Sequence, residues 1–143
     1  MRVTFDVVNS LDDIISELPP ETGGILGSSD GDVITHFLYD KGVDASLRSC
    51  SYTPDVKVFN KCISDWSTQG INFAGIFHTH FAGVKTLSQA DVVYIKNIMK
   101  AMPQGINQLY FPVYVLPDRI IISYKALKYE NKITIQQDEL VVV

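Results

Sequence analysis

The stretch from Phe77 to Asp91 carries the residue types of a metal centre. His78 and His80 are one residue apart, and Ser88 and Asp91 follow after a short segment. On an extended backbone, residues i and i+2 point to the same face, roughly 6.6 Å apart at the backbone. Two imidazoles placed in this way can bind one ion, and histidine suits zinc. We therefore predict a zinc site at His78 and His80 that needs a third protein ligand.

Asp91 is the candidate for the third ligand. It continues an apolar stripe with helical spacing, made of Ile95, Ile98, Met99 and Met102, so its carboxylate is expected to face inward. Burying a lone carboxylate is costly, and a cation at that place removes the cost. Two simpler interpretations stay open. A His-x-His pair is weak evidence by itself, and Ser88-x-x-Asp91 is also an ordinary helix-capping motif that can coexist with metal binding.

Glu21 precedes the glycine-rich segment Gly23-Gly24-Ile25-Leu26-Gly27. We predict a strand that starts at or just after Glu21, in which the glycines allow close approach of backbone or side chains. A phosphate-binding loop is excluded, because no lysine followed by serine or threonine ends the segment and no helix follows it. Taken alone, Glu21 would be interpreted as an exposed acid beside two prolines.

Local patterns predict the elements that position these residues. Strands are expected at 2–8, 21–28, 33–39, 47–52, 72–77, 109–116 and 119–126, with shorter pieces at 133–135 and 140–143. A first helix is expected from Ser10 to Pro19, and a third from Ser88 to about Met102. The second helix is expected to start with Thr53 as its cap, to bury Val56, Phe59, Ile63 and Trp66, and to end at Gly70.

Composition and length indicate one globular domain over residues 1–143, of α/β (α+β) class, with helices packed on one mixed sheet. Of the 143 residues, 46% are hydrophobic and 20% are charged, and the net charge is −4. The absence of a basic cluster argues against a nucleic-acid or anionic-membrane partner. No signal peptide or membrane-length apolar run is found. The two cysteines, Cys50 and Cys62, are interpreted as buried thiols in a reducing compartment, which predicts a cytoplasmic protein.

The combination of motifs resembles the JAMM signature of the MPN (JAB1/MPN/Mov34) family of zinc metalloproteases, and the shorter prokaryotic JAB branch in particular. The matching positions are Glu21, His78, His80, Ser88 and Asp91, in order and in spacing. One position departs from the pattern: Phe81 stands where family members usually have proline after the second histidine. The resemblance implies a single JAB/MPN domain with a mostly antiparallel sheet and a fold like that of cytidine deaminases.

The resemblance also implies a mechanism. His78, His80 and Asp91 would bind one Zn²⁺, and a water would take the open position. Glu21 would be the general base, passing a proton to the leaving amine, and Ser88 would stabilise the oxyanion. The reaction would be hydrolysis of an amide or isopeptide bond without a covalent intermediate.

The expected substrate follows from the family. It is the C-terminal tail of ubiquitin or of a ubiquitin-like protein, or a conjugate of one. Proteins similar to the activating and conjugating enzymes of that pathway would be further partners. Processing of a modifier, release of groups from a sulfur-carrier protein and antiphage defence all stay open.

Three alternatives compete with this interpretation. A non-catalytic MPN scaffold would be expected to lose the ligands, and here all five positions are kept. A zinc deaminase would have a His-x-Glu pair and Pro-Cys-x-x-Cys, and the chain has neither. A structural domain could bury its histidines without a metal. His36, between Thr35 and Phe37, is the example of such a histidine and is assigned no role.

Overall fold

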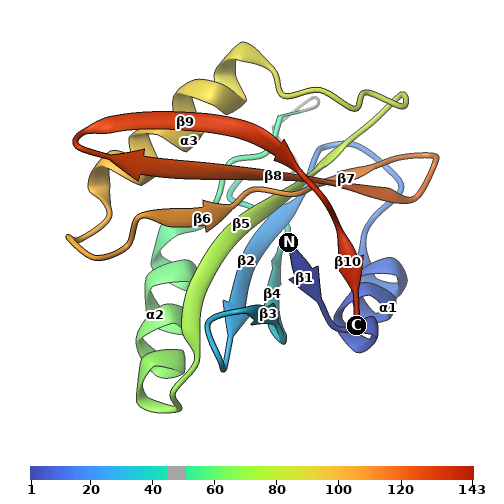
Figure 1. The fold of residues 1–143 in the computed structure, drawn as a ribbon. Helices are drawn as coiled ribbons and strands as arrows, with labels where there is room; N and C mark the ends of the chain where they lie inside the picture. The colour runs from blue at the N-terminus through green and yellow to red at the C-terminus, as the bar shows by residue number, and fades with distance from the viewer. Residues whose placement is uncertain (45–50) are drawn as a thin grey trace.

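The structure is a computed structural model, and it describes residues 1–44 and 51–143. Figure 1 shows the elements, coloured along the chain. The elements are, in chain order, β1 (Arg2–Val3), α1 (Phe5–Ile14), β2 (Gly23–Ser28), β3 (Val33–Ile34), β4 (His36–Asp40), α2 (Val56–Thr68), β5 (Asn72–His80), α3 (Gln89–Ala101), β6 (Gln108–Tyr110), β7 (Val113–Val115), β8 (Ile120–Tyr129), β9 (Lys132–Asp138) and β10 (Val141–Val142).

A seven-stranded mixed sheet forms the centre of the fold. Its order is β4-β2-β5-β6-β8-β7, and β9 pairs with β8. The strand β5 is antiparallel to β2 and parallel to β6 and β7, and the other pairs are antiparallel. This confirms the predicted α+β class and the interior position of the apolar segment 72–77.

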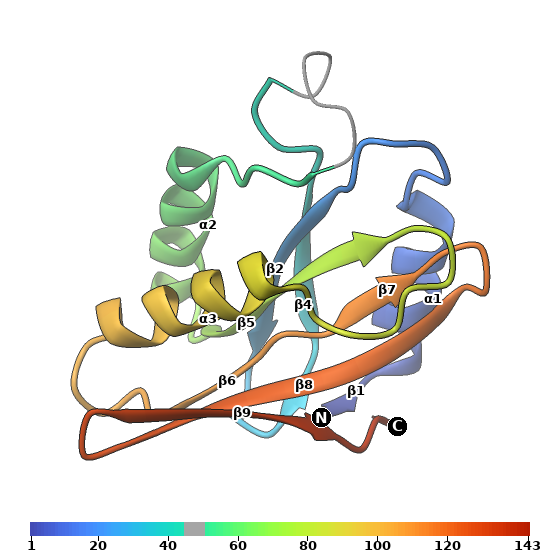
Figure 2. The same cartoon turned by 90° about the horizontal axis from the view of Figure 1, so that it is seen from above.

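Helices cover both faces of the sheet. In Figure 2, α2 and α3 lie on one side and α1 lies on the other. Ile25 and Ile76 belong to the core beneath α2 and α3, whereas their neighbours Leu26 and Phe77 belong to the core beneath α1. Successive side chains of a strand alternate between faces. His78 and His80 in β5 therefore face α2 and α3, as Ile76 does.

The N-terminal segment differs from the prediction. The sequence predicts a strand over 2–8 and a helix from Ser10, but α1 already begins at Phe5. The Thr4 hydroxyl accepts a hydrogen bond from the Val7 backbone N–H at 3.3 Å and caps the helix. Val7 and Leu11, one turn apart, are both buried. The strand prediction is wrong because a short apolar run fits the periodicity of a strand and that of a helix equally well. The helix cap and the tertiary contacts select the helix.

The second helix begins later than predicted. Asp55 is the N-cap in place of Thr53, and its side chain accepts a hydrogen bond from the backbone N–H three residues later. Phe59 and Trp66 are buried as predicted, but Val56 is 60% exposed. The apolar stripe in the sequence therefore begins at Val56, one turn before the part of the helix that packs on the sheet.

Two predicted strands are interrupted. The segment 33–39 forms β3 and β4 with a break at Thr35, and 109–116 forms β6 and β7 with a break at Phe111 and Pro112. Pro112 has no N–H and cannot continue the ladder. The strand predicted at 47–52 falls mainly on residues outside the described ranges, and Ser51 and Tyr52 are not in a strand.

The glycines of β2 permit the close approach that the sequence predicts. A Cβ atom at Gly24 would lie 1.9 Å from the carbonyl oxygen of Leu38 in β4. A Cβ atom at Gly23 would lie 2.4 Å from the carbonyl oxygen of Phe77 in β5. The segment next to Glu21 is therefore held closely between its two neighbouring strands.

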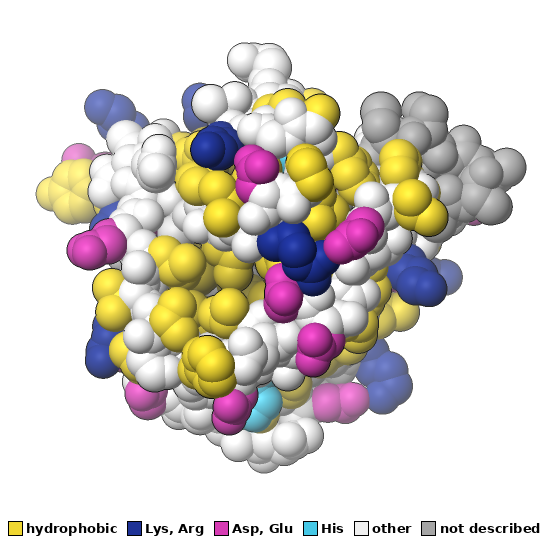
Figure 3. Space-filling model, turned by 90° about the vertical axis from the view of Figure 1, so that its right-hand side faces the viewer, with side chains coloured by type: hydrophobic (Ala, Val, Ile, Leu, Met, Phe, Trp, Pro, Cys, Tyr) yellow, Lys and Arg dark blue, Asp and Glu magenta, His cyan; other side chains and the backbone are white. Residues whose placement is uncertain are grey.

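A second sheet was not predicted. It joins β10, β1 and β3 in parallel, with two residues in each strand, too few for a recognisable period. Hydrophobic side chains are exposed between charged ones on the face that includes this sheet and α1 (Figure 3). The exposed large hydrophobic residues of these two elements and the residues next to them include Phe5, Ile14, Leu18, Val142 and Val143.

Of the two cysteines, Cys62 is a free, partly buried thiol in α2, and burial raises its pKa. Cys50 lies outside the described residues. No helix in the described ranges has the length and apolar character needed to cross a lipid bilayer.

Candidate metal centre

Three side chains converge where β5 ends and α3 begins. The Nε2 atoms of His78 and His80 are 2.9 Å apart. One carboxylate oxygen of Asp91 lies 3.3 Å from Nε2 of His78, and the other lies 3.1 Å from Nε2 of His80. The structure thus brings together all three residues that the sequence predicts as ligands.

These distances fit one small tetrahedral cation. Zinc–nitrogen and zinc–oxygen bonds of about 2.0–2.1 Å in tetrahedral geometry separate neighbouring ligand atoms by roughly 3.3 Å. The donor set of two imidazoles and a carboxylate also suits zinc. The residues present therefore fit the ion that the sequence predicts, while the role of each residue stays a prediction.

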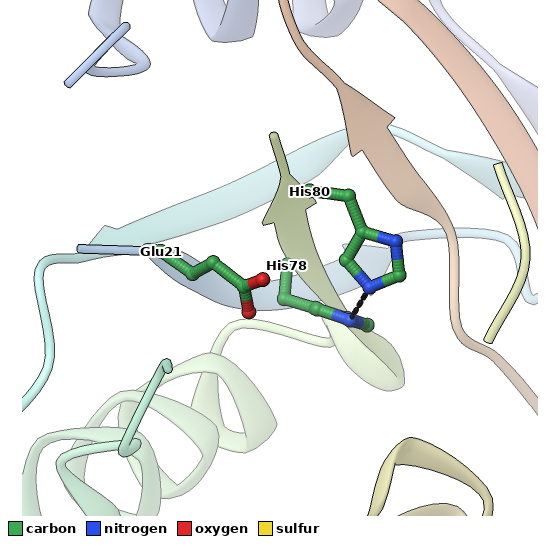
Figure 4. A group of neighbouring side chains, drawn as sticks. All are labelled: Glu21, His78 and His80. Carbon is green, nitrogen blue, oxygen red and sulfur yellow. Dashed lines mark hydrogen bonds between the residues drawn. The ribbon is translucent and has the colours of Figure 1, made fainter. Parts of the chain in front are cut away.

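Glu21 reaches the same site from the segment just before β2, the strand that pairs with β5. In the antiparallel pairing, Gly23 lies opposite His78, and continuing this register places Glu21 opposite His80. One ligand atom each of Glu21, His78 and His80 lies within 4.8 Å of the others. In Figure 4 the Glu21 carboxylate points toward the His78 ring. The position suits a base beside a metal, because Glu21 comes from a different segment of the chain than the histidines.

A buried threonine pair holds this register. Thr79, between the two histidines, is fully buried, and Thr22, next to Glu21, is 5% exposed. The Thr79 N–H donates to the Thr22 carbonyl oxygen at 2.8 Å, and the Thr22 N–H donates to the Thr79 hydroxyl at 2.9 Å. The Tyr39 hydroxyl donates to the Thr22 hydroxyl at 3.1 Å. The sequence analysis missed these residues, although the alternation along β5 already directs Thr79 to the opposite face from the histidines.

Replacing Thr79 by valine should destabilise the protein by about 1–3 kcal/mol, because the buried Thr22 N–H loses its acceptor. The measurement is the free energy of urea unfolding. Thr134→Val in β9 is the matched control, since Thr134 is exposed and its substitution should be nearly neutral. Equal effects of the two substitutions would contradict a specific role of the Thr22–Thr79 pair.

Ser88 and Asp91 form a capping box at the start of α3. The Ser88 hydroxyl accepts from the Asp91 N–H at 3.1 Å, and the Asp91 carboxylate accepts from the Ser88 N–H at 2.8 Å. Asp91 therefore caps the helix and faces the histidines at once, so capping does not exclude the predicted metal binding. Capping uses the acceptor capacity of the Ser88 hydroxyl, and its proton stays available for donation.

The electrostatics of the site favour an ionised Asp91. Burial raises its pKa, but hydrogen bonds from His78 and His80 outweigh burial and hold the pKa well below the usual 3.8. For His80, burial lowers the pKa, while the Asp91 carboxylate and the Val84 carbonyl raise it, and the net pKa lies above 6.5. The Val84 carbonyl oxygen lies 3.1 Å from Nδ1 of His80. A proton on Nδ1 leaves Nε2 as the atom that can bind a metal.

Zinc affinity should fall as pH falls through the raised pKa of His80, since protons and zinc compete for Nε2. Asp91 stays ionised over this range. The folding stability of the metal-free protein should instead increase as pH falls. The raised pKa of His80 gives a stabilising contribution that is present below 6.5 and is lost as pH rises through the folded-state pKa. Competition with a chromophoric chelator and urea unfolding, each between about pH 8 and pH 6, measure the two trends. A zinc affinity independent of pH would contradict this.

The loop after the second histidine is attached to the end of β7. The Leu116 N–H donates to the His80 carbonyl oxygen, and the Gly83 N–H donates to the Leu116 carbonyl oxygen, both at 2.8 Å. Phe81 packs against the core beneath α1, and Ala82 has a φ of +54°. The aromatic side chain at the position of the family's proline thus contributes to the core on the face opposite the histidines.

A pocket of about 360 Å³ opens beside the site, and Glu21, His78, Ser88 and Asp91 line it together with mainly apolar side chains. The sequence analysis did not predict this pocket. His36, by contrast, lies outside the site. It contacts the Thr35 hydroxyl at 2.8 Å and the Trp66 ring edge-on at 6.2 Å between centroids. These contacts agree with the structural interpretation given to His36.

Comparison with known proteins identifies the fold. No family model matches the sequence, and no curated protein matches it. A solved protein from Desulfitobacterium hafniense is 19% identical, with a TM-score of 0.64, covering 99% of this chain and 92% of that one. A protein from Salinibacter ruber is 16% identical, with a TM-score of 0.58 and coverages of 100% and 92%. A JAB1/MPN domain protein from Archaeoglobus fulgidus is 16% identical, with a TM-score of 0.55 and coverages of 100% and 99%. The chain therefore has the fold of JAB1/MPN domain proteins.

Proposed function

We propose that this protein is a zinc-dependent metallopeptidase or isopeptidase, which hydrolyses the bond after the C-terminal tail of a ubiquitin-like protein. The observation that carries the proposal is the convergence of His78, His80 and Asp91. The two Nε2 atoms are 2.9 Å apart, one Asp91 carboxylate oxygen lies 3.3 Å from Nε2 of His78, and the other lies 3.1 Å from Nε2 of His80. The Glu21 carboxylate beside them supports hydrolysis over a purely structural metal.

Each residue then has a defined task. When bound, zinc polarises the scissile carbonyl and lowers the pKa of a water toward about 7. Glu21 accepts the proton of the attacking water and delivers it to the leaving amine. The Ser88 hydroxyl donates a hydrogen bond to the developing oxyanion, with its acceptor side used by the Asp91 N–H. The capping box and the Val84 carbonyl hold Asp91 and His80 in place.

Purified protein should contain about one zinc per chain, because three protein ligands and an open position make a catalytic site. Elemental analysis measures the content. Zinc at 100 times its dissociation constant should stabilise the chelated protein by about 2.7 kcal/mol. A protein without metal, whose unfolding ignores both chelator and added zinc, would overturn the proposal.

Cleavage is tested with a ubiquitin-like protein joined through its C-terminal tail to a fluorescent protein. Zinc-loaded protein should separate the two parts, and chelated protein should not. The alternative function, a non-catalytic MPN scaffold, predicts that the protein cleaves no fusion, with or without zinc.

A further inference from the structure

The pocket of about 360 Å³ beside the candidate ligands has two parts with different chemistry. One side carries the polar residues Glu21, His78, Ser88 and Asp91. The other side is formed mainly by apolar and aromatic side chains, among them Ile76, Tyr94, Ile95 and Phe111. Hydrolysis of an amide needs the polar side alone, so the apolar side requires a separate explanation.

The apolar wall is built on the same elements as the ligands. Ile76 precedes His78 by two residues in β5 and faces the same side of the sheet. Tyr94 and Ile95 follow Asp91 by three and four residues in α3 and lie on the same helical face. Ile76 and Ile95 are 5% and 1% exposed. The wall is therefore part of the packed core and stands at a fixed position next to the ligand atoms.

The size and chemistry of the pocket indicate its occupant. Ligand pockets typically have about 300–1,000 Å³ and mostly apolar walls with a few polar groups. Burial raises the pKa of Tyr94 to about 12, so the phenol in this wall is uncharged at working pH. The apolar lining residues that are partly exposed are Tyr52, Pro54 and Tyr94. A tail of glycines alone would leave them uncovered, whereas a large apolar side chain would remove them from water.

We infer that the pocket binds a bulky aliphatic or aromatic side chain of the substrate residue that flanks the cleaved bond. The inference rests on the proposed function and names a specificity determinant for it. Substrates with such a side chain beside the scissile carbonyl are bound more tightly than substrates with small residues on both sides of it.

Simple hydroxamic acids test the pocket without a known substrate, because the hydroxamate binds the metal and its substituent reaches the neighbouring wall. Affinities of acetohydroxamic, 3-methylbutanohydroxamic and 3-phenylpropanohydroxamic acid for the zinc-loaded full chain are measured by calorimetry. The phenyl compound should bind at least about tenfold more tightly than acetohydroxamic acid, with the branched compound between them.

Ala90→Phe is the pocket-filling variant, since Ala90 lines the pocket and is solvent-exposed. It should remove the advantage of the phenyl compound over acetohydroxamic acid. Val93→Phe, at a 49% exposed position of the same helix that does not line the pocket, is the matched control and should keep the advantage.

The outcomes separate the two proposals. A protein that binds no zinc by elemental analysis overturns the proposed function and the inference together. Zinc-loaded protein that binds all three hydroxamic acids equally overturns only the inference, and so does an unchanged preference in Ala90→Phe. The wild-type series is decisive by itself if Ala90→Phe fails to fold.

Discussion

Glu21→Gln should keep the zinc and lose the hydrolysis. Glutamine has the same size but cannot accept the proton of the attacking water, and loss of a general base typically costs about 10²–10⁴-fold in rate. The three atoms that would hold the ion come from other residues. The cleavage rate of the ubiquitin-like fusion and the zinc content of the same preparation are the two measurements.

Glu130→Gln is the matched control, because Glu130 is exposed in the turn between β8 and β9 and its substitution should change neither quantity. A Glu21→Gln protein that cleaves at the wild-type rate would remove Glu21 as the base. One that loses zinc as well would instead make Glu21 part of the metal site.

His80→Ala should lose zinc binding. The His80 side chain is 6% exposed, and its Nε2 atom lies 3.1 Å from the Asp91 carboxylate. Loss of a residue that merely supports a ligand costs about 10–100-fold in metal affinity, so the loss of a ligand should exceed 100-fold. A competition titration with a chromophoric chelator measures the affinity, and the stabilisation by added zinc should disappear.

His36→Ala provides the control within the same chain. His36 lies away from the site and contacts Thr35 and Trp66, so its substitution should affect stability and leave zinc affinity unchanged. If both substitutions reduced zinc affinity alike, the predicted ligand set would be wrong.

The spacing of chemical groups in the sequence was sufficient to bring the main candidates together. The i and i+2 histidines of an extended segment face one side, and an aspartate in the first turn of an amphipathic helix faces inward. Both rules operate within a few residues, and in the structure each of the three predicted ligand side chains has a polar atom within 3.3 Å of another. The helix cap at Ser88 follows from equally local chemistry.

Local rules were less successful where two of them compete. The segment from Arg2 to Val8 satisfies strand and helix patterns alike, and the cap at Thr4 and the burial of Val7 and Leu11 select the helix. Thr53 and Asp55 are both acceptable N-caps, and the structure uses Asp55. In each segment the choice depends on which apolar side chains the sheet covers, and the sequence pattern does not contain that information.

By itself, the sequence determined the residue types, their spacing and the class of the fold. Only the tertiary structure decided how Glu21 meets the histidines, because the pairing of β2 with β5 joins residues such as Thr22 and Thr79, which are 57 positions apart. It also decided that an apolar pocket opens beside the predicted ligands, since the pocket's wall combines residues of β5, α3 and the connection between β6 and β7. The physical reason is the distance along the chain over which each effect operates. Helix caps and hydrophobic periodicity depend on residues within one or two turns, whereas strand register and packing depend on the whole folded chain.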